Sequence, residues 1–393
     1  MIRRYHTVQG FFEEAEALRA AFDEHFDRPY EYSASRHDIW HYFHVPNMYT
    51  VLQTTPDKIF PPELFARFIA RLQSWAVENI GVALLTEPQV HLYVDNCGQE
   101  LHSDFHNGFW GYVFSLTHWD ERNFFGGETL LFRDGAPNHK RHHVHGEDVY
   151  ELVPPRFNQL LVFNDSIVHC VRTLKGTMAP KLGRVVITGH IMAGDPVVTG
   201  PLSVSSVKHW LRAQAPQLAA KLQGFRDVHG LITCALEVAA NGAVREVSIR
   251  GHQLMSTTVN EASVELTTRT LVDFLQRSQL PPSSAASTVV LPLIVPIPDL
   301  QPLDIRIQHS CPPTELRSRV DVLLERLKAT ATWDGQHCGL SIEQPPCAGT
   351  LDLGQPGRVH LALDVPIMRP SHRAALEIRV QNLLQQSFHD RHP

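Results

Sequence analysis

The stretch LLVFNDSIVHCV, residues 160–171, places a polar turn between two apolar runs. Residues 160–163 have the continuous apolar character of a buried strand, residues 164–166 are typical of a turn, and residues 167–171 predict a second strand. A hairpin of this kind would bring His169 back toward the core. The stretch therefore predicts a β-rich region that holds a histidine in a defined place.

The surrounding sequence has the pattern of short strands and turns that is typical of an antiparallel β-structure. Further short runs with strand character are separated by Gly, Pro, Asn and Asp, and they lie at residues 90–94, 112–117, 129–132, 159–163 and 184–191. Two amphipathic helices are predicted before them, at residues 11–26 and from Pro61 to Gly81. Many short strands with turn residues between them favour a double-stranded β-helix, or jelly roll, with flanking helices.

The texture changes near residue 200, where helices and strands begin to alternate. Helices are predicted at 204–222, 262–279, 313–329 and 372–388, and strands at 231–238, 244–249, 289–297 and 359–365. This order is typical of an α+β domain. We expect a jelly-roll domain at residues 1–199 and an α+β accessory domain at residues 200–393, which would recruit the substrate or form a homodimer.

Composition excludes several classes of function. Of 393 residues, 43% are hydrophobic and the formal net charge is −6, so the chain predicts a globular protein without the basic surface that binds nucleic acid. No run of about 18 apolar residues predicts a membrane span or signal peptide, and we expect a cytoplasmic protein. The six cysteines form no CxxC pair, so neither a zinc ribbon nor a disulfide framework is expected.

Two histidines and one aspartate carry the predicted chemistry. In an extended chain His102 and Asp104 point to the same side, because side chains alternate along a strand. His169 would have to reach them from another strand. Two imidazoles and one carboxylate on one face of a metal leave three coordination positions open, which is the arrangement of non-haem Fe(II) oxygenases.

A longer ordered set of residues resembles a known family. Over roughly residues 85–195 the chain is similar to the prolyl-4-hydroxylase-like branch of the Fe(II)- and 2-oxoglutarate-dependent dioxygenases. The residues that carry this resemblance are Tyr93, Gly98, His102, Asp104, Gly126, Gly127, Glu128, Phe163, His169 and Arg184. The resemblance implies a jelly-roll enzyme that uses Fe(II), 2-oxoglutarate and O2.

It also implies roles for single residues. His102, Asp104 and His169 would bind the iron, and Arg184 would grip the distal carboxylate of 2-oxoglutarate in a bidentate contact. Arg184 heads an apolar run, where a buried guanidinium requires an anion. It lies further from His169 than is usual in the family, and Lys175 and Lys181 are alternatives.

Three further positions refine this expectation. Tyr93 matches a tyrosine whose hydroxyl contacts 2-oxoglutarate in the family, the alternative being a core tyrosine. The carboxylate of Asp104 fills the position that related halogenases leave free for chloride, which favours hydroxylation. His190 stands where the branch that repairs alkylated nucleic acid has a second arginine, which argues against that branch.

The segment from His139 to His145 contains four histidines, a lysine and an arginine in what is predicted to be an inserted loop. A solvated surface loop, a lid over the active site and a separate metal site are the three interpretations open at this level.

Together these features predict an oxygenase that hydroxylates an amino-acid side chain, free or within a peptide or protein, and releases succinate and CO2. One alternative is a natural-product oxygenase that desaturates or cyclises its substrate with the same metal site. Others are a catalytically silent binding protein with this fold, and a cupin-like metalloprotein that uses the same ligands without 2-oxoglutarate.

Overall fold

The computed structural model describes residues 4–28, 30–133, 149–258, 260–343 and 346–389. The histidine-rich segment from His139 to His145 lies outside the described residues. The chain divides into two compact units, Met1–Met192 and Ala193–Pro393. In the part of the chain that is described, no helix is both long and apolar enough to cross a membrane.

The first unit is built on one curled antiparallel sheet, in which the described strands follow the order β1-β10-β7-β12-β5-β3-β6-β11-β8-β9, with β2 paired to β3 and β4 to β12. The strands are β1 (Tyr5–Gln9), β2 (His41–Val45), β3 (Tyr49–Thr54), β4 (Leu84–Leu85), β5 (Gln89–Tyr93), β6 (Gly98–His102), β7 (Trp110–Ser115), β8 (Thr129–Phe132), β9 (Tyr150–Val153), β10 (Gln159–Asn164), β11 (His169–Val171) and β12 (Arg184–Met192). This architecture confirms the predicted jelly roll.

The sheet curls enough to bring strands together that are not neighbours in its order. Arg184 on β12 donates a hydrogen bond to the hydroxyl of Thr129 on β8, at 3.3 Å, although β5, β3, β6 and β11 lie between these strands in the sheet. The concave interior is therefore narrow enough for side chains from opposite walls to meet.

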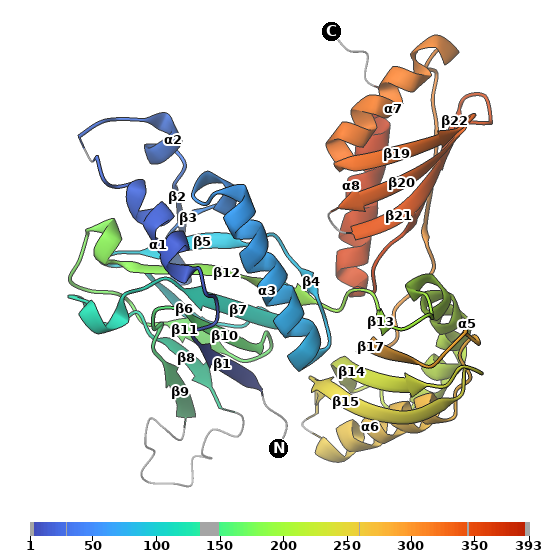
Figure 1. Ribbon diagram of the computed structural model, residues 1–393, viewed down its shortest axis with the longest axis horizontal. Helices are drawn as coiled ribbons and strands as arrows, with labels where there is room; N and C mark the ends of the chain where they lie inside the picture. Colours follow the sequence, from blue (N-terminus) through green and yellow to red (C-terminus); the bar gives the residue numbers. More distant parts are fainter. Residues whose placement is uncertain (1–3, 29, 134–148, 259, 344–345, 390–393) are drawn as a thin grey trace. The chain divides into compact units, whose positions relative to one another are not determined.

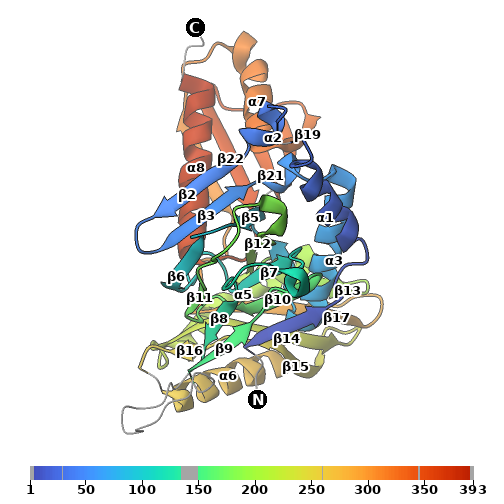
Figure 2. The same cartoon turned by 90° about the vertical axis from the view of Figure 1, so that its left-hand side faces the viewer.

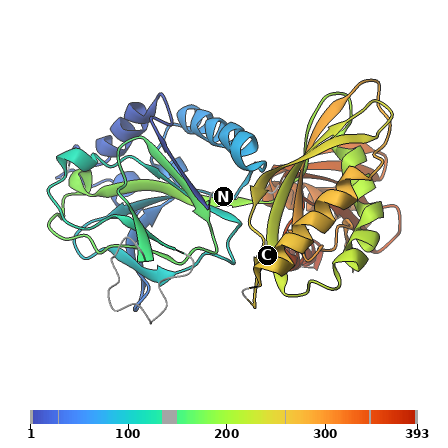
Figure 3. The ribbon, with the colours of Figure 1, turned by 90° about the horizontal axis from the view of Figure 1, so that it is seen from below.

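Helices cover one outer face of this sheet (Figures 1 and 3). They are α1 (Ala15–Glu24), α2 (Ala34–His37) and α3 (Pro62–Ile80), with short 3-10 turns at Pro56–Lys58, Trp119–Glu121 and Pro180–Leu182. The buried stripe of α3 packs on the sheet, where the rings of Phe68 and Phe114 lie 4.7 Å apart. Gly81 ends α3 in the left-handed conformation, as a helix-terminating glycine does.

The second unit contains two five-stranded sheets, counted over its described residues, each with helices against it (Figure 2). The first sheet comprises β13 (Val197–Thr199), β14 (Val228–Val238), β15 (Val244–His252), β16 (Met255–Ser256) and β17 (Ser287–Val295), with α5 (Val204–Leu222) and α6 (Glu261–Gln276). The second comprises β18 (Leu303–Gln308), β19 (Ala329–Asp334), β20 (His337–Glu343), β21 (Pro346–Asp352) and β22 (Arg358–Asp364), with α7 (Pro313–Leu327) and α8 (Pro370–His389).

Local sequence explains the turn and cap that organise the first of these sheets. Gly242 adopts a φ of +89° in the hairpin between β14 and β15, and the side chain of Asn241 accepts a hydrogen bond from the Ala243 amide. The Asn260 side chain caps α6 by accepting from the Ser263 amide.

Candidate metal centre

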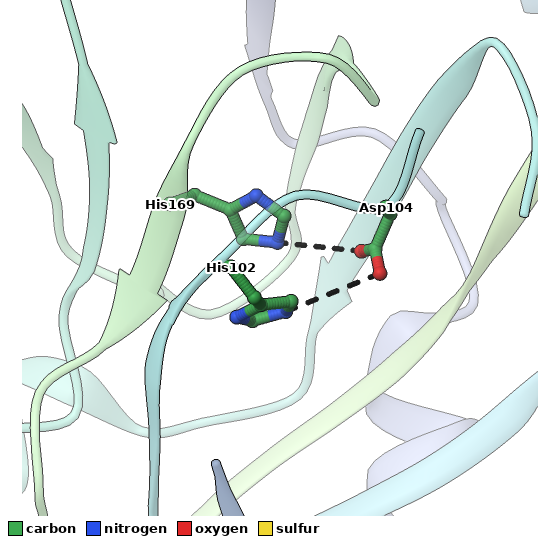
Figure 4. A group of neighbouring side chains, drawn as sticks. All are labelled: His102, Asp104 and His169. Atoms are coloured by element: carbon green, nitrogen blue, oxygen red, sulfur yellow. Dashed lines mark ion pairs between the residues drawn. The ribbon is translucent and has the colours of Figure 1, made fainter. Parts of the chain in front are cut away.

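Strand pairing brings the three predicted metal ligands together. His102 ends β6, Asp104 follows two residues later, and His169 begins β11. His169 lies directly opposite His102 in the β6–β11 ladder, and residues in opposed positions of an antiparallel pair point to the same face. Figure 4 shows the two imidazoles beside each other, with their planes tilted, and the Asp104 carboxylate facing both.

The distances fit a shared divalent ion. The Nε2 atom of His169 lies 3.3 Å from the Asp104 carboxylate, and that of His102 lies 4.0 Å from it. The two imidazole centroids are 4.3 Å apart. These three residues form one of the groups in which ligand-type atoms lie within 4.8 Å of one another.

The second nitrogen of each imidazole is already used. His102 Nδ1 lies 2.6 Å from the Glu100 carbonyl, and His169 Nδ1 lies 2.9 Å from the Ile167 carbonyl. Because a carbonyl only accepts, each Nδ1 carries the proton, and each Nε2 is left with the lone pair that binds a metal. Asn107 adds a 3.0 Å hydrogen bond to Asp104 Oδ1 and helps to orient the carboxylate.

The protonation states also suit metal binding. Burial raises the pKa of Asp104, but the close contact with the His169 imidazole and the influence of the other nearby histidines outweigh this effect and lower the pKa to about 2. Burial, followed by the charge of His169, lowers the pKa of His102. At neutral pH the cluster therefore offers an ionised carboxylate and a neutral His102 imidazole.

A pocket of about 300 Å³ opens beside the cluster, and both predicted 2-oxoglutarate contacts line it. Arg184 is only 1% exposed, and its guanidinium carbon lies 4.4 Å from the centre of the Tyr93 ring. Its Nη2 donates to Thr129, whereas Nε and Nη1 find no hydrogen-bond partner among the residues that the structure describes. A buried guanidinium with two unused donors requires an anion, which a carboxylate of 2-oxoglutarate would supply.

The two alternative basic residues lie elsewhere. Lys175 is exposed and contacts the side chain of Asn96, and Lys181 pairs with Asp27. Neither of them lines the pocket, among the residues that are described.

Several pocket residues were not predicted from the sequence. Phe43, Tyr49 and Gln53 of the β2–β3 hairpin line the pocket, as do His91 and His190. The alternation of larger apolar and polar residues over 41–54 was the available signal for the hairpin. Nothing in the sequence places His190 beside Asp104, because this proximity depends on the curl of the sheet.

Comparison with known proteins gives structural likeness only. No family model matches the chain, and no curated protein matches its sequence. Among solved structures, a *Pseudomonas putida* prolyl-4-hydroxylase matches at 16% identity and a TM-score of 0.33, over 48% of this chain and 92% of that one.

Two other solved structures also match about half of this chain. HygX from Streptomyces hygroscopicus, solved with nickel and 2-oxoglutarate, matches at 12% identity and a TM-score of 0.32, over 47% of this chain and 81% of that one. The 2-oxoglutarate-dependent carbocyclase SnoK from nogalamycin biosynthesis matches at 12% identity and a TM-score of 0.34, over 49% and 81%. At these values the assignment of chemistry depends on the side chains of this chain.

Those side chains could hold a divalent metal ion and a carboxylate ligand. Two imidazole nitrogens and one carboxylate oxygen converge on one point, and a buried arginine with unused donors faces the same pocket. The first unit thus has a jelly-roll fold, with His102, Asp104 and His169 as its candidate metal ligands.

Proposed function

We propose that the first unit is an Fe(II)- and 2-oxoglutarate-dependent oxygenase that hydroxylates an amino-acid side chain, free or within a peptide or protein. One observation carries this proposal: the fully buried guanidinium of Arg184, with two donor atoms unused within the described residues, shares a pocket with the His102, Asp104 and His169 cluster. A metal site without a co-substrate would have no use for such an arginine, and leaving two of its donors without an acceptor would destabilise the fold.

In this proposal each residue has a defined task. His102, Asp104 and His169 hold the iron on one face and leave its other positions open. Arg184 binds the distal carboxylate of 2-oxoglutarate, and Tyr93 packs against the guanidinium and fixes its direction. When bound, the iron supplies the activation of O2, so that R–H, O2 and 2-oxoglutarate give R–OH, succinate and CO2.

The remaining wall of the pocket would receive the substrate. Phe43, Tyr49 and Val51 give it an apolar and aromatic surface, whereas Gln53 and Gln99 add polar groups near its rim. This mixture suits a compact side chain that is carried on a polar backbone. A pocket of about 300 Å³ has room for 2-oxoglutarate and part of a second small molecule.

The second unit has its own sheets and helices, and among its described residues no cluster of metal-ligand type is found. We retain for it the proposal of substrate recruitment or homodimerisation. Sedimentation of the full chain at several concentrations tests the second role: a single mass equal to the 44.3 kDa chain excludes the homodimer.

The proposed reaction is tested with the full chain, Fe(II), 2-oxoglutarate and a panel of free amino acids and short peptides, by measuring succinate release and product mass. A gain of one oxygen supports hydroxylation, and a loss of two hydrogens indicates the desaturating alternative. Arg184→Leu should raise the KM for 2-oxoglutarate at least roughly tenfold, because a charged hydrogen bond is lost. Lys181→Ala is the matched control and should leave this KM unchanged. Equal effects of the two variants would overturn the role of Arg184.

A further inference from the structure

A second aspartate and histidine, Asp165 and His190, meet beside Asp104, and His190 lines the pocket. Asp165 follows β10, and His190 lies within β12. His190 Nδ1 lies 3.1 Å from both carboxylate oxygens of Asp165. The Asp165 side chain is 1% exposed and that of His190 is 22% exposed, so the pair presents only its imidazole to the pocket.

Two glycines make room for this pair. A Cβ atom on Gly108 would lie 2.8 Å from Asp165 Oδ2 and 2.8 Å from His190 Cβ, and one on Gly111 would lie 2.8 Å from Asp165 Oδ1. Separations this short are steric clashes with a buried carboxylate that has no space to move. The segment after Asp104 is therefore fitted closely around Asp165 and His190.

The pair leaves one imidazole nitrogen unused. Nδ1 is bound to Asp165, and no hydrogen bond to Nε2 is found within the described part of the chain. Nε2 is also not a fully buried atom left without a hydrogen-bond partner. Because the ring is held at its opposite nitrogen, Nε2 is directed away from Asp165, and the pocket is the open space that His190 lines.

Charge favours a proton on this nitrogen. Ligand-type atoms of Asp104, Asp165 and His190 lie within 4.8 Å of one another, so two carboxylates face one imidazole. Burial lowers the pKa of His190, but the hydrogen bond to Asp165 and the charges of Asp165 and Asp104 outweigh it and raise the pKa. His91 and His102 also lie near the ring, and the charge of His190 contributes to lowering the pKa of each.

We propose that His190, held by Asp165, binds the substrate of the oxygenase by donating a hydrogen bond from Nε2 to an acceptor oxygen close to the carbon that is oxidised. This inference rests on the proposed function and narrows its substrate class. The oxygen can be the carboxylate of a free amino acid or the carbonyl of a peptide, which share the same hydrogen-bonding chemistry.

The test uses two series of probes, the free L-amino acids and their N-acetyl-N-methylamides, which present a carboxylate and a peptide carbonyl respectively. Succinate release by the wild-type chain selects the best probe in each series, and the preferred series identifies the source of the oxygen. If neither series is turned over, the amino-acid substrate class in the proposed function is wrong and this inference falls with it.

With the selected probe, His190→Leu should raise its KM at least roughly tenfold, while kcat changes less than about threefold and the KM for 2-oxoglutarate less than about twofold. His190→Gln restores a donor and should recover the KM to within about threefold. Asp165→Leu should raise the KM of the probe about as much as His190→Leu does. The double variant should raise this KM by less than about a further twofold, because the two residues act as a unit.

His118→Leu is the matched control, because His118 stacks on Phe157 with ring centres 5.0 Å apart and does not line the pocket. The inference is overturned if His190→Leu leaves the probe KM unchanged while the wild type turns the probe over. It is also overturned if His190→Gln is as impaired as His190→Leu with the fold intact by thermal melting, since the donor would then be irrelevant.

Discussion

Two groups of the same residue types share the pocket of the first unit, and they differ in one hydrogen bond. In the metal cluster, His102 and His169 use Nδ1 on backbone carbonyls, and their Nε2 atoms face a carboxylate. In the pair, His190 uses Nδ1 on the carboxylate of Asp165 itself. In both arrangements Nδ1–H is the donor, and what differs is the acceptor: a neutral carbonyl leaves the lone pair of Nε2 available to a metal, whereas an ionised carboxylate also favours a second proton on Nε2.

The comparison shows that composition does not decide whether a histidine becomes a ligand. A backbone carbonyl cannot take up a proton, so it fixes the tautomer of the imidazole without changing its charge. A buried carboxylate favours the charged imidazole, which is a poor ligand and a good donor. A carboxylate partner at Nδ1 is also found in metal-ligating histidines, so the candidate iron ligands are distinguished by the convergence of their Nε2 atoms on the Asp104 carboxylate.

The largest effect is expected when a residue of the metal cluster is replaced. His102→Ala removes one of three ligands and should weaken Mn²⁺ binding by more than roughly a hundredfold, whereas His190→Leu should change it by less than about threefold. Calorimetric titration of the metal-free chain measures both. Comparable losses in the two variants would mean that His190 is itself a ligand.

A fourth pocket histidine, His91, sharpens the comparison, because its hydrogen-bond contact within the described residues is a hydroxyl and not a carboxylate. His91 has its Nδ1 3.4 Å from the Thr188 hydroxyl, and burial lowers its pKa to about 4. The unfolded chain binds this proton more readily, so stability is complete above pH 6.5 and is lost as the pH falls toward 4. The loss from His91 is at most about 3 kcal/mol.

Urea unfolding at pH 7.5 and pH 4.5 measures this dependence. His91→Asn should lose less stability between these two pH values than the wild type does. An identical loss in the variant and the wild type would show that His91 does not titrate in this way.

The close fit of Gly108 and Gly111 around Asp165 and His190 predicts a loss of stability smaller than the one expected from His91. Gly111→Ala forces a Cβ against Asp165 and should lower the free energy of unfolding by about 1–3 kcal/mol. Gly224→Ala is the matched control, because no atom lies within 4 Å of its built Cβ, and a change below about 0.5 kcal/mol is expected. Equal melting temperatures of the two variants would contradict the close fit around Asp165.

The smallest effect concerns the orientation of the carboxylate in the metal cluster. Asn107→Ala removes the 3.0 Å hydrogen bond to Asp104 and leaves every ligand in place, so Mn²⁺ affinity should fall about tenfold. Asn96→Ala, which removes an amide outside the pocket, should leave the affinity unchanged. A hundredfold loss with Asn107→Ala would mean that this residue does more than orient Asp104.

Much of the fold and site could be predicted from local sequence. The strand that starts at Arg184 was visible as an apolar run, and His102 and Asp104 share a face by simple alternation. The strands β18 to β21 were missed, although β18 and β20 alternate exposed and buried residues in the pattern of a half-buried strand. In β21 the signal is weaker, because its sequence holds mostly small residues.

The Asp165–His190 pair could not have been predicted, for a different reason. Asp165 appeared in the sequence as an ordinary turn residue, and His190 as an interruption of an apolar strand. Their contact depends on β10 and β12 flanking β7, and on Gly108 and Gly111 leaving space between them. Pairing of this kind is a property of the tertiary structure and leaves no signal at either position.

The central claim is that His102, Asp104 and His169 bind one iron that also binds 2-oxoglutarate. The most direct measurement is the anaerobic visible spectrum of the chain after addition of Fe(II) and 2-oxoglutarate, in which the chelate gives a weak charge-transfer band. We expect the band in the wild type and in His190→Leu, and its loss in His169→Ala. A wild type without the band, or a His169→Ala variant that retains it, would contradict the account.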